Sequence, residues 1–235
     1  MPTTLHVLQH APYEGPAHLG WWALTRGLRL ARTQLHTGEA LPSVEDLENL
    51  VILGGPMSVG DETTYPWLAA EKALIGEAIE EGLPVLGVCL GAQLIAEVLG
   101  GEVTRAEHRE VGWHPVTLTG EAGKHRALQD LPSSFQALHW HGDTYELPTG
   151  ATHLARSEAC EQQAFAYQDH VLALQFHLEF APGDVQRLAE ACPQDLEPGP
   201  WVQGEDAMME DPERYQAAQG HLETILDGWL GVERP

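Results

Sequence analysis

A four-residue apolar run, Val85–Val88, leads directly into Cys89 and then into a segment with helical spacing that starts near Leu90. Glycine occupies positions 87 and 91, two residues to either side of the cysteine. A chain that turns from a strand straight into a helix has little room for side chains at these two positions, which is why glycine is favoured there. The segment therefore restricts the chain to folds in which a buried strand ends where a helix begins.

The first half of the chain repeats this alternation of short apolar runs and helical patterns, with Gly and Pro between them. The order strand, helix, strand, helix predicts an α/β fold with an open, mostly parallel sheet covered by helices on both faces. The expected strands are 5–8, 28–35, 51–53 and 85–88, and the expected helices are 17–27, 67–81 and the segment from 90.

The second half has a different pattern, with short strand candidates separated by few residues. Such spacing favours antiparallel pairing, so we expect an antiparallel extension beside the parallel core. Helical patterns return at 181–191 and 211–230, on either side of a proline-rich loop. A chain of 235 residues fits a single domain, 1–235, with a helical C-terminal segment from about 205. The expected strands of this half are 111–118, 135–139, 152–156, 162–167 and 171–176.

The charge of the chain argues against several classes of partner. The 12 Lys and Arg residues against 35 Asp and Glu residues give a formal net charge of -23, which opposes nucleic acid and anionic membrane surfaces. No run approaches the roughly 18 apolar residues that a membrane-spanning helix needs, and the N-terminus lacks a basic leader. Three well-separated cysteines do not suggest a disulfide framework. We therefore expect a cytoplasmic protein that binds neither nucleic acid nor membrane.

Cys89 lies where a reactive thiol would be presented. In a tight strand-to-helix turn the side chain at the tip projects above the sheet, and the amide of Leu90 points to the same place. A helix start also lowers the pKa of a thiol, which raises its thiolate fraction. The alternative is a buried core cysteine beside glycines that only allow close packing. Cys160 and Cys192 lack this setting, and we expect both to be inert.

A thiolate nucleophile needs a base, and the base needs a group that orients it. An apolar strand pattern at 171–176 continues to His177, with Glu179 two residues further on. Alternation along a strand would place the imidazole and the carboxylate on one face, where the carboxylate can orient the ring toward Cys89. A histidine at a strand end is more often a structural residue. This pair supports a catalytic role only because it occurs together with the turn at Cys89 and with a third segment.

The apolar run 51–53 ends in two glycines and a proline, Gly54, Gly55 and Pro56. This arrangement leaves backbone amides free at the carboxyl edge of the sheet, where open α/β sheets bind ligands. The Gly55 amide could act opposite the Leu90 amide as the second donor of an oxyanion hole. A simple turn after a strand is the alternative interpretation.

With these segments in order, the chain resembles the class I glutamine amidotransferases, which use a Cys-His-Glu triad and include the amidotransferase part of GMP synthase. The matching motifs extend from about residue 5 to residue 190, and their combination is highly specific. They are GGPMS at 54–58, GVCLGAQLIA at 87–96, HWHGD at 139–143 and QFHLE at 175–179. The resemblance implies a flavodoxin-like sheet and hydrolysis of a glutamine side-chain amide.

The resemblance also implies a role for each matching residue. Cys89 would be the nucleophile, His177 the general base and acid, and Glu179 the residue that orients the histidine. The amides of Gly55 and Leu90 would form the oxyanion hole. The substrate-binding residues would be Met57, Gln93, Trp140 and His141, with Gln93 one helical turn beyond the nucleophile.

One position departs from the family pattern. The family usually has proline between the triad histidine and glutamate, whereas this chain has Leu178. Because that side chain should point away from the pair, we expect little effect on the chemistry. Beyond about Cys192 the chain carries no motif that matches the family.

His139, His141 and Asp143 alternate along a predicted strand and could present ligands to a metal. The chain has 13 histidines, so chance clustering is easy, and His114 is the only obvious ligand from another segment. We therefore predict neither a metal nor a cofactor.

Glutamine hydrolysis with delivery of ammonia to a separate synthase subunit is the leading functional hypothesis. The chain has no Gly-rich phosphate loop with lysine, so an ATP-using synthesis would belong to another polypeptide. One alternative is a stand-alone γ-glutamyl hydrolase acting on another γ-glutamyl amide, and a second is a non-catalytic regulatory or binding subunit of the same fold. The expected small-molecule substrate is glutamine or a γ-glutamyl compound, and the sequence does not determine the oligomeric state.

Overall fold

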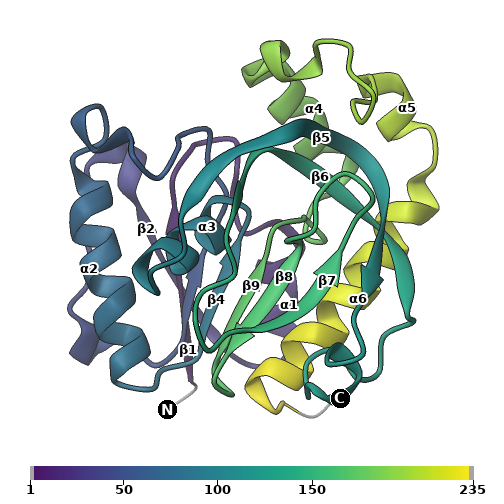
Figure 1. Ribbon diagram of the computed structural model, residues 1–235. Helices are drawn as coiled ribbons and strands as arrows, with labels where there is room; N and C mark the ends of the chain where they lie inside the picture. The colour runs from purple at the N-terminus through teal and green to yellow at the C-terminus, as the bar shows by residue number, and fades with distance from the viewer. Residues whose placement is uncertain (1–2, 233–235) are drawn as a thin grey trace.

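The computed structural model describes residues 3–232, and within them one sheet of nine strands has the order β2-β1-β3-β4-β9-β8-β7-β5-β6. The first five strands in this order are parallel, and the other four continue the sheet through antiparallel pairs. Figure 1 shows this continuous sheet with its helices. The predicted α/β fold, with a parallel flavodoxin-like core and an antiparallel extension, is confirmed.

The parallel half consists of short strands, of which the edge strand β2 is mostly exposed or half-buried and the other four are largely buried on both faces. Leu50 pairs with Val85 and Leu86 with Leu172, so neighbouring strands place apolar residues side by side. Continuous apolar runs are typical of strands covered on both faces, which is why the sequence pattern located them. Their bounds are β1 Thr4–Gln9, β2 Arg29–Gln34, β3 Leu50–Ile52, β4 Val85–Val88 and β9 Val171–Leu174.

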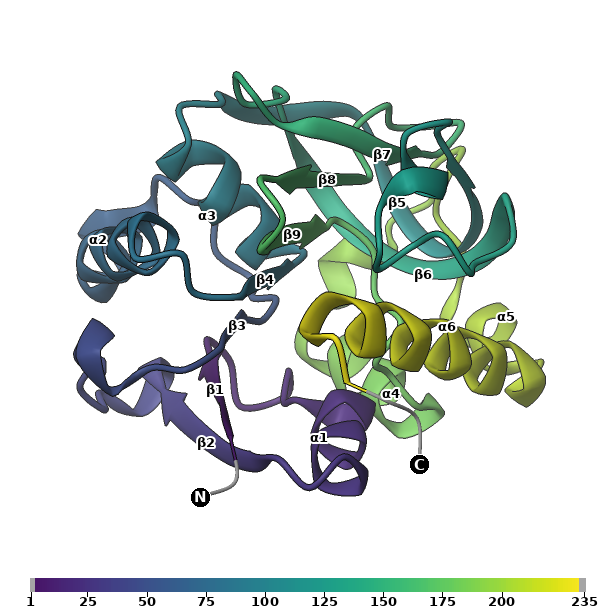
Figure 2. The same cartoon turned by 90° about the horizontal axis from the view of Figure 1, so that it is seen from below.

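Helices cover both faces of this half. Figure 2 shows α2 and α3 on one side of the sheet and α1, α4 and α6 on the other. Successive strand residues enter opposite layers, because Val51 packs in a cluster with Trp22 whereas Ile52 packs in a second cluster with Leu68. No helix within residues 3–232 is both long and apolar enough to cross a membrane. The helices are α1 Ala17–Thr25, α2 Trp67–Glu80, α3 Leu90–Val98, α4 Pro182–Ala191, α5 Glu205–Met209 and α6 Pro212–Leu230.

The antiparallel half contains two long strands, β5 and β6, which curve across the upper part of the molecule in Figure 1. Both are longer than their apolar patterns predicted, because the added residues, 103–110 in β5 and 140–145 in β6, are mostly polar. The pairing of β5 with β6 shifts register between Arg105 and Glu110, where the ribbon bends. The bounds are β5 Val103–Leu118, β6 Ser134–Tyr145, β7 Thr152–Arg156 and β8 Ala164–Tyr167.

The segment after α4 packs against β5 rather than forming a simple surface loop. A short 3₁₀ turn at Pro193–Leu196 follows α4. Further on, Gln203 Nε2 donates to the Trp113 carbonyl at 2.8 Å, and Trp113 Nε1 donates to the Met208 carbonyl at 2.9 Å. These contacts bring residues near 195 to the carboxyl ends of the parallel strands.

Candidate active site

The turn between β4 and α3 has strained backbone geometry. Cys89 adopts φ 52° and ψ -107°, a conformation that residues with side chains rarely adopt. A Cβ atom at Gly87 would lie 2.5 Å from the Gly91 carbonyl carbon, and one at Gly91 would contact the Ile52 carbonyl. Both glycines are therefore required for the helix to start directly against the sheet, and this packing maintains the conformation of Cys89.

The Cys89 thiol lies beside backbone amides without acceptors. Neither the Gly55 amide nor the Leu90 amide donates a hydrogen bond to any acceptor in residues 3–232. A Cβ atom at Gly54 would lie 3.5 Å from the Cβ atom of Cys89, so the Gly54–Gly55 peptide is close to the thiol. The Cys89 Sγ atom itself lies 3.6 Å from the Trp140 carbonyl oxygen. The turn thus combines a thiol with two available N–H donors.

His177 and Glu179 are in direct contact, although not within a strand. The His177 Nδ1 atom lies 2.6 Å from Glu179 Oε1. β9 ends at Leu174, and His177 pairs only with Leu138 through an isolated bridge. The prediction that strand alternation aligns the two side chains is therefore wrong. Instead, the Leu178 amide donates to Glu179 Oε2 at 2.9 Å and holds the carboxylate beside the ring.

The charge state of His177 follows from this environment. Burial by itself would lower the pKa of the imidazole, but the Glu179 carboxylate and Cys89 outweigh that effect and hold the pKa of His177 well above its ordinary value. The ring also stacks on Phe180, with centroids 4.5 Å apart. A buried imidazole in this state is suited to hold the proton that a neighbouring thiol gives up.

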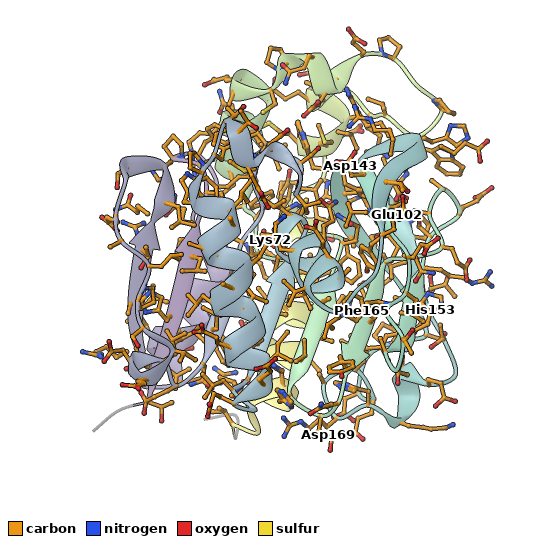
Figure 3. All side chains as sticks on the ribbon, turned by 60° about the vertical axis from the view of Figure 1, so that its left-hand side comes forward. Lys72, Glu102, Asp143, His153, Phe165 and Asp169 are labelled. Carbon is orange, nitrogen blue, oxygen red and sulfur yellow. The ribbon has the colours of Figure 1, made fainter. Side chains whose placement is uncertain are left out.

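A cavity of about 280 Å³ opens over the turn. Figure 3 shows Asp143, one of its lining residues, at the opposite end of the molecule from Asp169, which lies in the turn before β9. Two of the predicted site residues, Glu179 and Leu90, lie behind the cavity wall. The other predicted residues line it, namely Gly55, Met57, Cys89, Gln93, Trp140, His141 and His177.

The side chains predicted to bind substrate are already held by the protein. Gln93 Nε2 donates to Gln175 Oε1 at 3.1 Å and approaches the Asp143 carbonyl at 3.4 Å. Trp140 Nε1 donates to Asp195 Oδ2 at 3.0 Å, so the indole group is turned to the segment after α4. These contacts give a pocket that is shaped before any ligand binds.

Charged and polar residues without a recognised role also line the pocket. Ser58 Oγ donates to Asp143 Oδ2 at 2.6 Å, and Arg105 Nη1 lies 2.9 Å from Asp143 Oδ1. Ser58 and Asp143 belong to two of the quoted motifs, which is a signal that could have joined them. The others come from segments without a motif. The lining residues with charged, amide or hydroxyl side chains that the sequence did not predict are Glu14, Ser58, Arg105, Arg109, Asp143, Gln194 and Asp195.

Glu14 is an acidic residue of this pocket with only 6% of its surface exposed. A Cβ atom at Gly54 would contact its carboxyl group and would lie 3.2 Å from His177 Cε1, so the two side chains are neighbours. Burial raises the pKa of Glu14 to about 7, with a partial offset from His177 and His10. Near neutral pH this carboxyl group is therefore present in both protonation states.

The chain as a whole is similar to known proteins. A family model described as glutamine amidotransferase class-I matches residues 24–192, which is most of the chain. The chain belongs to the class I glutamine amidotransferase family.

Individual relatives agree with this assignment. The chain is 35% identical over 196 residues to the glutamine amidotransferase-like protein YfeJ of Salmonella typhimurium, with 82% of each chain covered. It is 38% identical over 135 residues to the glutamine-hydrolyzing GMP synthase of Thermomicrobium roseum, covering 57% of this chain and 24% of that protein. A crystal structure of a glutamine amidotransferase from Methylobacillus flagellatus matches with a TM-score of 0.90 and 29% identity, over 100% of this chain and 97% of that chain.

One buried cluster of this amidotransferase has the donor set of a metal site. Glu110, His139 and His141 bring ligand atoms within 4.8 Å of one another. The third candidate ligand beside the two histidines is therefore Glu110, and not His114 or Asp143. His114 Nε2 instead lies 3.0 Å from the Trp201 carbonyl. The sequence pattern did not indicate Glu110, which is brought to the histidines only by the pairing of β5 with β6.

Hydrogen bonding accounts for the position of this carboxylate. Glu110 Oε2 lies 3.1 Å from His141 Nε2 and accepts from Gln163 at 2.7 Å and from Ser157 at 3.1 Å. Burial alone would raise the pKa of Glu110, but the two histidines outweigh it and hold the pKa well below its usual range. The network fixes His141 at the pocket wall, whereas Glu110 Oε1 and both ring nitrogens of His139 are buried without a hydrogen-bond partner in residues 3–232.

The other two cysteines each lie beside a hydroxyl group. Cys160 and Cys192 are buried and free, and burial raises the pKa of both thiols. Cys160 Sγ lies 3.2 Å from Thr144 Oγ1, and Cys192 Sγ lies 3.6 Å from Tyr13 Oη. Cys192 borders the pocket, which its sequence setting did not indicate.

Proposed function

We propose that this chain hydrolyses the side-chain amide of glutamine through a γ-glutamyl thioester on Cys89, releasing glutamate and supplying ammonia to a separate synthase. The observation that carries this proposal is the strained turn at Cys89 beside the His177–Glu179 pair and two amides without acceptors. A nucleophile, a base with an orienting carboxylate, and donors for a developing oxyanion are the groups that acyl transfer needs.

In the first half-reaction the Cys89 thiolate attacks the side-chain carbonyl carbon of glutamine. The oxygen becomes an oxyanion and accepts hydrogen bonds from the Gly55 and Leu90 amides. His177, which took the thiol proton, gives it to the leaving nitrogen as the carbon–nitrogen bond breaks. Ammonia departs and the γ-glutamyl group remains on sulfur.

In the second half-reaction water attacks the thioester carbonyl. His177 removes a proton from the water, and the same two amides stabilise the second tetrahedral oxyanion. Collapse of this intermediate breaks the carbon–sulfur bond and frees glutamate. Glu179 keeps Nδ1 protonated throughout, so that Nε2 faces the reacting atoms.

The pocket supports an amino-acid-sized substrate, since about 280 Å³ is at the small end of ligand cavities. Met57, Gln93, Trp140 and His141 would bind the amino and carboxylate ends of glutamine, largely through their backbone. The GMP synthase that this chain resembles is about four times the length of the matched part, because the match covers 24% of it. We therefore infer that a synthase outside the matched residues carries out the acceptor chemistry. We also propose that the protein acts in the cytoplasm, a reducing compartment in which thiols stay free.

A second candidate, a stand-alone γ-glutamyl hydrolase, is favoured by one observation. The pocket adjoins a surface depression that shares Arg105, Arg109 and Gly142 with it and is otherwise lined by residues 106–108, residues 197–200 and Val202. A leaving group larger than ammonia could extend into this depression. The two candidates share the chemistry at Cys89 and differ only in the group that leaves.

The experiment that tests the proposal measures ammonia and glutamate release from glutamine, and amine release from γ-glutamyl methylamide, by wild type and Cys89→Ala. We expect glutamine turnover by wild type and none by the variant. Faster turnover of the substituted amide would favour the stand-alone hydrolase. Absence of turnover of both compounds would favour the non-catalytic subunit, and equal turnover by Cys89→Ala would exclude Cys89 as the nucleophile; either result would overturn the proposal.

A further inference from the structure

His10, directly after β1, makes two hydrogen bonds that link the helix α2 to the strand end at Gly54. Its Nδ1 atom lies 2.9 Å from the Gly54 carbonyl oxygen, and its Nε2 atom lies 2.8 Å from Glu71 Oε1. The His10 and Glu71 side chains are fully buried. A carbonyl oxygen can only accept, so Nδ1 carries the proton and donates it toward Gly54.

The Gly54 carbonyl belongs to the same peptide group as the Gly55 N–H. The peptide group is planar, and no peptide bond in residues 3–232 is cis, so the carbonyl oxygen and the amide hydrogen point in opposite directions. A hydrogen bond that fixes the carbonyl therefore also fixes the direction of the N–H. Because Gly55 lines the pocket and its amide has no acceptor, the N–H points away from His10 toward the cavity side.

The orientation of the Gly54–Gly55 peptide group must be fixed by a contact from elsewhere, because both of its residues are glycine. A Cβ atom at Gly54 would contact the Glu14 carboxyl group, and one at Gly55 would lie 2.6 Å from Met57 Sδ and 2.8 Å from His10 Cβ. Side chains are thus excluded by the packing, while a peptide between two glycines can rotate at little steric cost. Rotation would replace the N–H by the carbonyl oxygen, which repels an oxyanion.

Glu71 in turn fixes the orientation of the imidazole. Burial would lower the pKa of His10, but the charge and hydrogen bond of Glu71, the Gly54 carbonyl and Glu14 outweigh it, so the pKa of His10 is raised. Trp67 stacks on the ring with centroids 5.5 Å apart and limits its rotation. The imidazole is therefore held from one side by charge and from another by packing.

We propose that His10, held by Glu71, is a positioning residue that directs the Gly55 N–H at the oxyanion formed on Cys89. The proposal rests on the proposed amide hydrolysis and adds to it a second buried histidine–glutamate pair, which acts through the backbone and does not touch the substrate. The hydrogen bond to the Gly54 carbonyl also polarises the peptide, which makes its N–H a stronger donor.

The test compares His10→Ala with the matched control His6→Ala, which removes a histidine of β1 that instead contacts Thr33. In His10→Ala we expect kcat for glutamine to fall by about 10- to 100-fold, because one oxyanion donor is no longer fixed. We expect KM to change by less than about 3-fold, since ground-state binding is not involved. The control should retain wild-type kcat.

Alkylation of Cys89 by iodoacetamide separates positioning from general damage. Alkylation is a displacement at carbon that forms no oxyanion, so its rate in His10→Ala should stay close to that of wild type. The double variant His10→Asn, Glu71→Gln restores a donor to the Gly54 carbonyl and should recover part of the lost kcat. A parallel loss of alkylation and hydrolysis in His10→Ala, or full hydrolysis without His10, would overturn the proposal.

Crystal structures of wild type and His10→Ala keep this test independent of the proposed function. We expect the Gly54–Gly55 peptide to rotate or to occupy two orientations in the variant. An unchanged peptide orientation would contradict the positioning role even if wild type hydrolysed no γ-glutamyl compound. Inactive wild type together with a rotated peptide would instead reject the proposed function alone.

Discussion

The parallel and antiparallel halves of the sheet contribute different things to the pocket. The parallel half brings groups to the pocket through short turns whose geometry is imposed by close packing against glycine. The antiparallel half, with the segment after α4, brings charged groups through pairs that join distant parts of the chain. From the parallel half come Glu14, Gly55, Cys89 and His177, and from the other half come Arg105, Arg109, Trp140, Asp143 and Asp195.

This difference suggests that the two halves have different roles, one in the reaction and the other in the selection of ligands. Groups on rigid, buried strand ends are suited to act on reacting atoms, because they need little reorganisation during the reaction. Groups on a curved ribbon are suited to select among ligands, because they surround the opening of the pocket. Substitutions in the parallel half should therefore change kcat, and substitutions in the antiparallel half should change KM.

Glu179→Gln should have the largest effect among the variants considered below. Removal of the carboxylate charge lowers the pKa of His177 and leaves the imidazolium without its counter-charge, so we expect kcat to fall by roughly 100-fold or more. Steady-state glutamine hydrolysis measures this, with Glu158→Gln, an exposed residue, as control. A change in KM alone would contradict the proposal that substitutions in the parallel half change kcat.

Glu14→Gln should change stability with a defined pH dependence. The pKa of Glu14 is about 7 in the folded protein against an ordinary value of 4.5, so the folded state holds a proton that the unfolded chain loses between these values. The stability of wild type therefore falls as pH rises from 4.5 to 7, and the variant should escape this loss.

At one pKa unit per about 1.4 kcal/mol, the gain in Glu14→Gln is roughly 3 to 4 kcal/mol above pH 7. Thermal unfolding should show a Tm higher than that of wild type by roughly 7 to 14 °C at pH 8 and close to wild type at pH 4.5. An equal shift at both pH values would show that burial of the charge is not the cause.

Asp143→Asn tests the junction between the two halves. Asp143 of β6 joins Ser58, which follows β3, to Arg105 of β5, and the loss of its charge should loosen this wall of the pocket. We expect KM for glutamine to rise by about 10-fold with kcat changed by less than about 3-fold. A large loss of kcat with unchanged KM would assign this residue to the chemistry.

Leu178→Pro should have the smallest effect. Proline is usual at this position in the family, but it lacks the N–H that here donates to Glu179 Oε2. Because His177 still contacts Glu179 Oε1, we expect kcat to fall by no more than about 3-fold, in keeping with one hydrogen bond of about 1 kcal/mol or less. Leu178→Ala keeps the amide and is the control for loss of the buried side chain.

The parallel half and the residues at its strand ends could be predicted from the sequence. Val85–Val88 and 51–53 are continuous apolar runs that end in glycine, and both features are local. The positions of Cys89 and Gly55 follow from these runs, because the carboxyl ends of parallel strands meet at one edge. The contact between His177 and Glu179 was predicted, but the strand alternation from which it was predicted is absent from this segment. A bend after β9 and the hydrogen bond from the Leu178 amide bring the two side chains together instead.

The rest depends on contacts between distant segments. Residues 103–110 are polar and give no strand pattern, yet they pair with β6 and bring Glu110 to His141. Glu14, between β1 and α1, and Asp195, in the turn after α4, both line the pocket, and no local pattern encodes their approach. His10 and Glu71 are 61 residues apart, so their pairing appears only in the folded chain.

The central claim is that Cys89 carries the γ-glutamyl group during amide hydrolysis. Rapid acid quench of wild type with glutamine, followed by peptide mass spectrometry, tests it directly. We predict a γ-glutamyl adduct on the peptide that contains Cys89, none on the peptides of Cys160 and Cys192, and none in Cys89→Ala. Ammonia release without any adduct on Cys89 under quench conditions that preserve thioesters, or an adduct on another residue, would contradict the account.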